Sequence, residues 1–283
     1  MKDLLLGAHV SLNEDLNKAF EILKVIQVFV TSPGTMKMPD VHHPFFKRYK
    51  PWAHIPLIIH GPYTGSFIHD YRDRRSRFLQ NYTVKLINIA VAMQFTLRFV
   101  VHLGVIPKGR SSKEAVYNIK MNLKELNKKV KRIKGDFRVC LENDSGCIGR
   151  SNVNTAIGIF YLMKHNKYPW LGSCTDTEHA FASGFPIDGW VGSALASDVI
   201  HLNAIPQHII KGGCKDEHSK HLLKDSQCKR TLSEVIWTAK KQRIPLILER
   251  SGWDIITSDI AYTHRLCKAF ENKIVNTPVK GET

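Results

Sequence analysis

Residues 97–142 read LRFVVHLGVIPKGRSSKEAVYNIKMNLKELNKKVKRIKGDFRVCLE, and this stretch contains one complete strand–helix–strand unit. Its two ends, 97–103 and 137–142, are short apolar runs, as in strands that are buried on both faces of a parallel sheet. Between them, Ser111 and Glu114 have the spacing of a helix capping box. Apolar residues then recur every three or four positions, which predicts a helix with one apolar face. They are Val116, Ile119, Leu123, Leu126, Val130 and Ile133.

The same alternation of apolar runs and helical segments continues along the chain. The runs lie at 6–10, 25–31, 55–61, 97–103, 137–142, 172–176, 199–203 and 244–249. Eight strands that alternate with helices are typical of a (β/α)8 TIM barrel, an α/β fold. Because no repeat or linker divides the chain, we predict a single barrel domain at residues 1–275 and a flexible tail at 276–283.

The composition is that of an ordinary folded protein, with 43% hydrophobic and 23% charged residues among 283. No stretch reaches the roughly 18 consecutive apolar residues that a membrane span needs, and the first residues have too short an apolar run for a signal peptide. Six cysteines without a CxxC pair argue against a disulfide framework and a zinc finger. We expect a soluble intracellular protein, in the cytoplasm, nucleoid or nucleus and not secreted, with reduced cysteines.

The chain carries a large excess of positive charge. Lysine and arginine number 41 against 25 aspartates and glutamates, which gives a formal net charge of +16. Such an excess concentrates polyanions near the protein and favours a nucleic-acid partner. The alternative interpretation is a generally basic, solvated surface. We interpret the lysines opposite the apolar face of the 112–130 region in that way.

Histidines and carboxylates lie where the predicted strands end. In a TIM barrel these ends meet at one mouth, where active sites lie. Several carboxylates that converge there are costly to bury unless cations neutralise them. Imidazole and carboxylate ligands together suit zinc, manganese or iron. Nine candidates exceed what one ion needs and fit two or three ions: His60, His102, Glu142, Asp176, His179, His201, Asp216, His218 and Glu249.

Six motifs resemble the endonuclease IV family of apurinic/apyrimidinic endonucleases, in the order found in that family. They are Gly7-Ala-His-Val-Ser11, Leu141-Glu-Asn143, Cys174-Thr-Asp-Thr-Glu-His-Ala-Phe-Ala-Ser-Gly184, His201-Leu-Asn203, Asp216-Glu-His-Ser219 and Pro245-Leu-Ile-Leu-Glu249. The resemblance implies three zinc ions per chain, with Mn²⁺ or Fe²⁺ as the alternative at one position. The resemblance also implies that His60 and His102 hold one ion and that Glu142 bridges this ion to a second. The remaining assignments are Asp176, His201 and Glu249 for the second ion, and His179, Asp216 and His218 for the third.

The resemblance also implies an activity and a partner. Family members cleave the phosphodiester bond 5′ of an abasic site in double-stranded DNA, leaving a 3′-hydroxyl and a 5′-deoxyribose phosphate, and some trim blocked 3′ ends. For this chain it implies a DNA-repair enzyme, with Glu142 and Glu249 as catalytic residues, that works as a monomer. The expected DNA-contacting residues are Tyr63, Lys108, Arg110 and Lys215.

The chain departs from the family pattern in several places. Glu178 stands where the family usually has cysteine, and Ala204 replaces the aspartate of the His-x-Asn-Asp run. Residues 220–223 replace the usual Leu-Gly-x-Gly, and residues 31–35 lack the family's DNA-contacting Asn/Arg/Trp pattern. The candidate metal ligands are unaffected, so we interpret the chain as a divergent member.

Two other functions remain open. A sugar isomerase or epimerase on the same barrel needs only a single-metal set, which Glu142, Asp176, His201 and Glu249 would supply. It does not need His60, His102 or the Asp216/His218 pair. A DNA-binding protein with an inactive site is the third alternative, and the nine candidate ligands argue against it.

Overall fold

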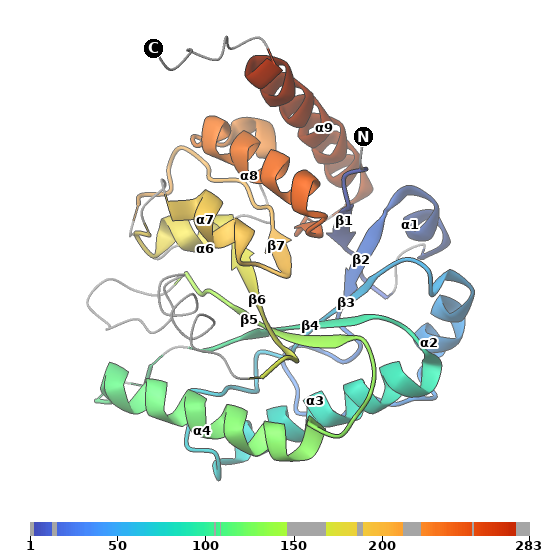
Figure 1. Ribbon diagram of the computed structural model, residues 1–283, viewed down its shortest axis with the longest axis vertical. Helices are drawn as coiled ribbons and strands as arrows, with labels where there is room; N and C mark the ends of the chain where they lie inside the picture. The colour runs from blue at the N-terminus through green and yellow to red at the C-terminus, as the bar shows by residue number, and fades with distance from the viewer. Residues whose placement is uncertain are drawn as a thin grey trace, which may run out of the picture.

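Eight parallel strands close into a barrel in chain order, from β1 to β8, and β8 pairs back onto β1 (Figure 1). The computed structural model describes residues 3–12, 16–104, 106–107, 109–145, 168–185, 189–211, 222–250 and 252–275. Within these residues the predicted (β/α)8 TIM barrel is confirmed.

Each of the eight predicted runs overlaps one strand, and the sixth strand begins one residue before its predicted run. The strands are β1 (Leu6–His9), β2 (Val25–Val28), β3 (Leu57–His60), β4 (Leu97–His102), β5 (Phe137–Glu142), β6 (Leu171–Asp176), β7 (Val199–His201) and β8 (Leu246–Leu248). Most runs extend past the observed strand. Thus residues 29–31 follow the end of β2, because there the chain leaves the sheet and lines a pocket.

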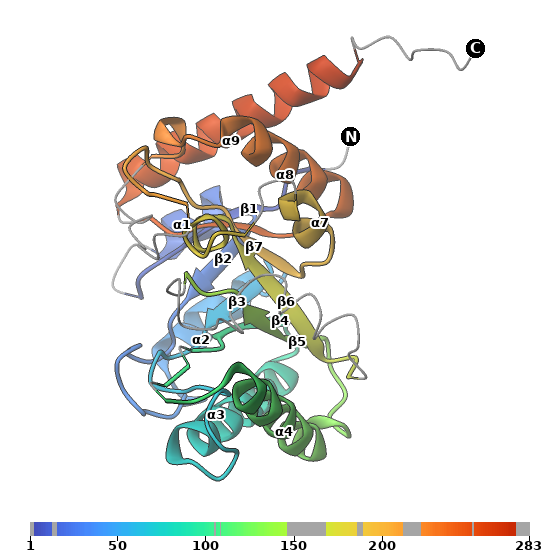
Figure 2. The same cartoon turned by 90° about the vertical axis from the view of Figure 1, so that its left-hand side faces the viewer.

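The helices surround the barrel, with α3 and α4 on one side and α8 and α9 on the opposite side (Figures 1 and 2). The α-helices are α1 (Leu16–Ile22), α2 (Pro44–Tyr49), α3 (Arg74–Met93), α4 (Ser112–Val130), α6 (Thr177–Ala182), α7 (Trp190–Leu195), α8 (Lys229–Gln242) and α9 (Trp253–Val275). Short 3-10 turns lie at Lys50–Trp52 and Leu223–Asp225.

Helix α4 begins and packs as the sequence predicts. The Ser111 side chain accepts a hydrogen bond from the Glu114 N–H at 3.2 Å, as a capping box requires. Ile119, Leu123 and Leu126 are buried against the barrel, and the lysines of the opposite face are exposed.

A layer of small apolar side chains fills the inside of the barrel. Seven strands supply it, through Val25, Ile58, Val100, Cys140, Cys174, Val199 and Ile247. The eighth strand, β1, places Gly7 in register with Val25 and Ile247. A methyl group on Gly7 would lie 1.9 Å from the carbonyl oxygen of Val25, so the approach of β1 to β2 requires glycine here.

The described cysteines are free thiols, as expected. Cys140, Cys174 and Cys267 are buried and Cys228 is partly buried. Cys147, Cys214 and the predicted tail at 276–283 lie outside the described residues, and the single-domain assignment stays a prediction. Among the described residues, no helix combines the length and the apolar character of a membrane span.

The Gly7–Val25 contact predicts that Gly7→Ala destabilises the barrel by about 1–3 kcal/mol, because the backbone of β2 must shift. Urea unfolding measures the free energy directly. Gly34→Ala is the matched control, since an added Cβ there meets no atom within 4 Å. Equal unfolding free energies for the two variants would show that β1 and β2 adjust without strain.

Candidate metal centre

A ring of polar side chains lies directly above the apolar layer, at the carboxyl ends of the strands. Side chains alternate between the two faces of a strand, so residues two positions apart share the inner face. Two residues after each member of the layer stand His9, Gln27, His60, His102, Glu142, Asp176, His201 and Glu249. Five of the eight are fully or almost fully buried, namely Gln27, His60, Glu142, Asp176 and His201.

Glu142 lies at the centre of this ring. Its Oε1 lies 2.9 Å from Nδ1 of His201. Its Oε2 lies 3.3 Å from Nε2 of His60 and 3.2 Å from Nε2 of His102. One carboxylate from β5 therefore joins imidazoles from three other strands.

Oε2 of Glu142 is buried and has no hydrogen-bond partner among the described residues. The His60 ring explains why, because its Nδ1 lies 2.9 Å from the carbonyl oxygen of Gly61. A carbonyl only accepts, so Nδ1 carries the proton and Nε2 presents a lone pair to the Glu142 oxygen. A lone pair that faces a carboxylate oxygen fits a cation between them. Metal-binding histidines usually donate their other N–H to such a carbonyl.

A second group contains Asp176, His201 and Glu249 together with Glu142. Nδ1 of His201 lies 3.3 Å from Oε2 of Glu249 and 3.8 Å from Oδ2 of Asp176. Its Nε2 lies 2.9 Å from the side-chain oxygen of Gln27. This contact places the proton on Nε2, so that in the neutral ring Nδ1 can bind a metal ion.

Two amide side chains hold the carboxylates of this second group. Gln27 donates to Oε1 of Glu249 at 2.9 Å and to Nδ1 of His9 at 3.1 Å. Asn203 donates to Oδ2 of Asp176 at 2.5 Å and to Oε2 of Glu249 at 3.1 Å. Both carboxylates are thus oriented by neutral donors.

A third group consists of Asp176, Glu178 and His179, whose ligand atoms lie within 4.8 Å of one another. Nδ1 of His179 lies 2.9 Å from the backbone oxygen of Asn143, which leaves Nε2 as the lone-pair nitrogen. Glu178 is fully buried, although in the sequence it stands out only as a departure from a family pattern. The other predicted members of a third site, Asp216 and His218, lie outside the described residues.

The electrostatics of the ring favour an ionised Glu142 beside a protonated His201. Burial opposes the charge on His201, but the neighbouring Glu249 and Glu142 carboxylates outweigh it and hold the pKa of His201 well above its usual range. Burial opposes ionisation of Glu142, but the neighbouring His102 and His201 rings outweigh it and hold the pKa of Glu142 well below its usual range. Burial also lowers the pKa of His9 to about 4, so this ring is neutral at physiological pH. Burial raises the pKa of Cys174, which lies near Glu142 and His201, to about 12. The Cys174 sulfur is therefore a thiol rather than a thiolate.

Tyr63 lies at the rim of the ring. Its side chain is 60% exposed, and its ring centroid lies 5.4 Å from that of His102 and 5.6 Å from that of His60. Arg110 is exposed and forms an ion pair with Glu114, one helical turn away. The other two predicted DNA contacts, Lys108 and Lys215, lie outside the described residues.

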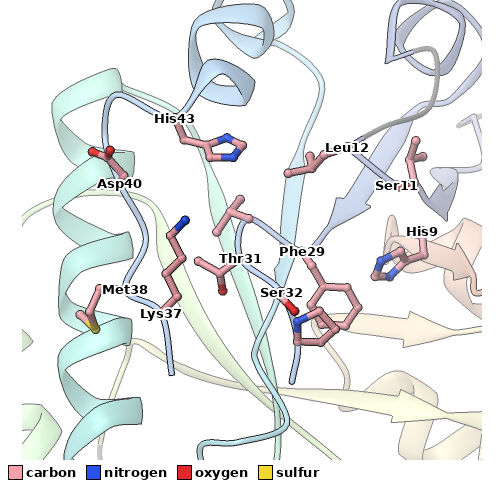
Figure 3. Close-up of a pocket in the computed structure, with 13 residues that line it drawn as sticks. His9, Ser11, Leu12, Phe29, Thr31, Ser32, Lys37, Met38, Asp40 and His43 are labelled. Atoms are coloured by element: carbon pink, nitrogen blue, oxygen red, sulfur yellow. The ribbon is translucent and has the colours of Figure 1, made fainter. Parts of the chain in front are cut away.

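A pocket of about 510 Å³ adjoins the ring at the ends of β1 and β2 (Figure 3). His9 and Phe29 lie side by side in its wall, with ring centroids 4.7 Å apart. Phe29 lies equally close to His60, so the same aromatic ring borders the pocket and contacts a ligand candidate. The polar groups of the wall come from Ser11, Thr31, Ser32, Lys37, Asp40 and His43.

Sequence reasoning missed His9, Gln27 and Asn203 as members of the site. His9 stands one position before the end of a predicted apolar run, as His60 and His102 do, so the signal was present. Gln27 interrupts an otherwise apolar strand, which is a weaker signal. Asn203 was quoted within a motif, but its contacts with Asp176 and Glu249 depend on three strands that meet only in the fold.

The donor set fits one or more divalent cations. It combines buried carboxylates with imidazoles, and among the described residues no lysine or arginine side chain contacts Oε2 of Glu142. Carboxylate and imidazole without thiolate is a set that zinc and other first-row metals bind.

No protein-family model matches the chain. It is 25% identical over 271 residues to a protein named probable endonuclease 4 from Halothermothrix orenii, covering 86% of this chain and 92% of that protein. A protein of the same name from Mycoplasmopsis pulmonis is 24% identical over 277 residues, with the same coverage. Among solved structures, a D-tagatose 3-epimerase-like protein has a TM-score of 0.72 at 16% identity, covering 97% of this chain and 100% of that one.

At that identity the structural similarity concerns the barrel alone. The sequence similarity spans most of both chains. The chain is therefore similar, at low identity, to proteins named probable endonuclease 4.

Proposed function

We propose that this protein is a metal-dependent endonuclease that hydrolyses the phosphodiester bond 5′ of abasic sites in double-stranded DNA. One observation carries the proposal. His60 and His102 meet Oε2 of Glu142, outside the group of Glu142, Asp176, His201 and Glu249 that a single ion would occupy. A site for at least two ions that share Glu142 suits phosphodiester hydrolysis.

The ions are zinc in this proposal, with His60, His102 and Glu142 holding the first. Glu142, Asp176, His201 and Glu249 hold the second, and His179 contributes to a third together with Asp216 and His218. A bound divalent ion acts as a Lewis acid toward phosphoryl oxygens and lowers the pKa of coordinated water. Glu142 and Glu249 keep the charge that retains the ions, and Gln27 and Asn203 fix the direction of the Glu249 oxygens.

Other parts of the molecule would bind the DNA. The net charge of +16 provides sequence-independent attraction to the phosphate backbone, which suits an enzyme that must find a lesion anywhere. Tyr63 is exposed beside His60 and His102, where its ring can stack at the gap left by a missing base. The adjoining pocket is large enough for a sugar that is turned out of the duplex, and turning it out is easiest where no base pair is lost.

A sugar epimerase or isomerase is the second candidate. The similarity to a D-tagatose 3-epimerase-like protein and the four-residue group of Glu142, Asp176, His201 and Glu249 favour it. An epimerase or isomerase function does not explain the presence of His60 and His102 in the ring, nor the large positive charge. A DNA-binding protein without activity would not need the buried carboxylates at all.

The metal proposal predicts different effects of Glu142→Gln on the metal-free and metal-loaded protein. Without metal, the new amide can donate to His60 or His102, which offsets the lost ion pair with His201, so the melting temperature changes little. Zinc at 100 times its Kd raises the free energy of unfolding of the wild-type protein by about 2.7 kcal/mol, and we expect the variant to lose this stabilisation. Thermal melts with and without zinc, together with elemental analysis, measure both effects.

Glu114→Gln is the matched control, because Glu114 lies on the surface and pairs with Arg110. Zinc should stabilise this variant against thermal unfolding as much as it stabilises the wild type. We expect at least two ions per wild-type chain. If zinc stabilised Glu142→Gln as much as the wild type, Glu142 would not be a metal ligand.

The activity itself is tested with a duplex that contains one abasic site. We expect cleavage on its 5′ side, with a 3′-hydroxyl that a DNA polymerase can extend, and complete loss of cleavage after treatment with a strong chelator. The same preparation is assayed for epimerisation of ketohexoses. Epimerisation without cleavage would establish the second candidate, and DNA binding without either activity would establish the third.

Asp216→Asn combined with His218→Ala separates the nuclease from the epimerase. If these residues hold a third ion that stabilises charge on the departing oxygen, cleavage falls by at least about 10²-fold, while DNA binding weakens much less. Single-turnover cleavage and fluorescence anisotropy measure the two quantities. Cleavage at the wild-type rate, with an unchanged melting temperature, would contradict the three-ion arrangement.

A further inference from the structure

A buried ion pair lies directly behind the proposed metal ligands. Arg250 follows Glu249 at the end of β8, and Asp259 lies on α9. The two residues are 5% and 1% exposed, and Nε of Arg250 donates to Oδ2 of Asp259 at 2.9 Å. Burying two charges is costly, and such a pair commonly adds little net stability compared with apolar residues of similar size. Its position beside the site therefore calls for another role.

Arg250 connects this pair to the carboxylates of the second metal group through Asn203. Nη1 of Arg250 donates to Oδ1 of Asn203 at 2.9 Å. The amide nitrogen of Asn203 then donates to Asp176 at 2.5 Å and to Glu249 at 3.1 Å. Because arginine only donates and carboxylates only accept, the Asn203 amide has one orientation that satisfies both sides.

The order of charges along this chain of hydrogen bonds is significant. Asp259 neutralises Arg250, and the group that contacts Asp176 and Glu249 is a neutral amide. The two carboxylates are therefore held in place while their negative charge remains available to a cation. Direct contact with the guanidinium would orient them equally well but would compete with a metal ion.

Asp259 has one more contact, on the far side of the pair. Its Oδ1 accepts a hydrogen bond from the backbone N–H of Leu223 at 2.9 Å. Leu223 stands five residues after His218 in the sequence. The same carboxylate thus fixes the guanidinium behind the second metal group and the chain segment that follows the Asp216/His218 motif.

We propose that Arg250 and Asp259 are positioning residues, which act through Asn203 to set the direction of the Asp176 and Glu249 carboxylates for metal binding. This inference rests on the proposed function, since it assigns the pair to the same metal site. It predicts that removal of the pair lowers metal affinity even where the fold is unharmed.

The test replaces the whole pair, because loss of one partner leaves the other charge buried alone and strongly destabilises a protein. The variant Arg250→Met/Asp259→Leu keeps the volume and is expected to melt near the wild-type temperature. Its affinity for zinc, measured by competition with a chromophoric chelator, should fall by about 10–100-fold. The absorption spectrum of bound Co²⁺ should change as well, because the carboxylate directions change.

Thr263→Val is the matched control for a buried polar change on α9. Thr263 is fully buried and donates only to the backbone oxygen of Asp259, at 2.7 Å, so zinc affinity should be unchanged. Asn203→Ala should lower zinc affinity by a similar factor, and its combination with the double variant should add little, as expected for residues that act through one another.

Each outcome is decisive. Wild-type zinc affinity in the double variant would reduce the pair to a structural element and overturn the inference, as would an equal loss in Thr263→Val. Additive losses with Asn203→Ala would show that the pair does not act through that amide. A wild-type protein that binds no zinc would overturn the proposed function itself, whereas the other outcomes leave it intact.

Discussion

The central constraint in this structure is the burial of Glu142. A carboxylate in an environment of low polarity needs partners, and its Oε2 faces ring nitrogens of His60 and His102 without a hydrogen bond among the described residues. A buried polar atom without a partner costs about 1–3 kcal/mol, and more when it is charged. A cation bound between Oε2 and the two rings would compensate for this free-energy cost. The other members of the ring are arranged around this carboxylate.

The barrel makes this arrangement through the two-residue period of its strands. The inner face of each strand carries a small apolar residue, or Gly7 in β1, and then a polar residue two positions later. The apolar layer closes the barrel from below, which keeps water away from one side of the polar ring. Parallel register then brings the polar residues to one level, as in the pairing of His102 with Glu142 and of Asp176 with His201. The fold and the site thus come from the same periodicity.

This periodicity explains what the sequence could predict. Eight apolar runs indicated the strands, and the residues that end them indicated the ring, because a strand-end position needs no knowledge of neighbours. Gln27 and Asn203 could not be assigned in this way. Gln27 contacts Glu249, which lies 222 residues away in the sequence, and the contact exists only because β1 closes the barrel between β2 and β8. Arg250 likewise reaches the Asp176 and Glu249 carboxylates only through Asn203, a contact that exists only in the fold.

Amides also account for how the site can hold several carboxylates without neutralising them. Gln27 and Asn203 together contact both oxygens of Glu249, and Asn203 contacts Asp176. Neutral donors remove rotational freedom from the carboxylates but leave their charge in place, so the entropy of ordering them is lost on folding rather than on metal binding. The metal-free protein consequently carries electrostatic repulsion among Glu142, Asp176 and Glu249. In a metal site built in this way, metal affinity and folding stability are linked, because a change that relieves the repulsion stabilises the metal-free protein while it weakens metal binding.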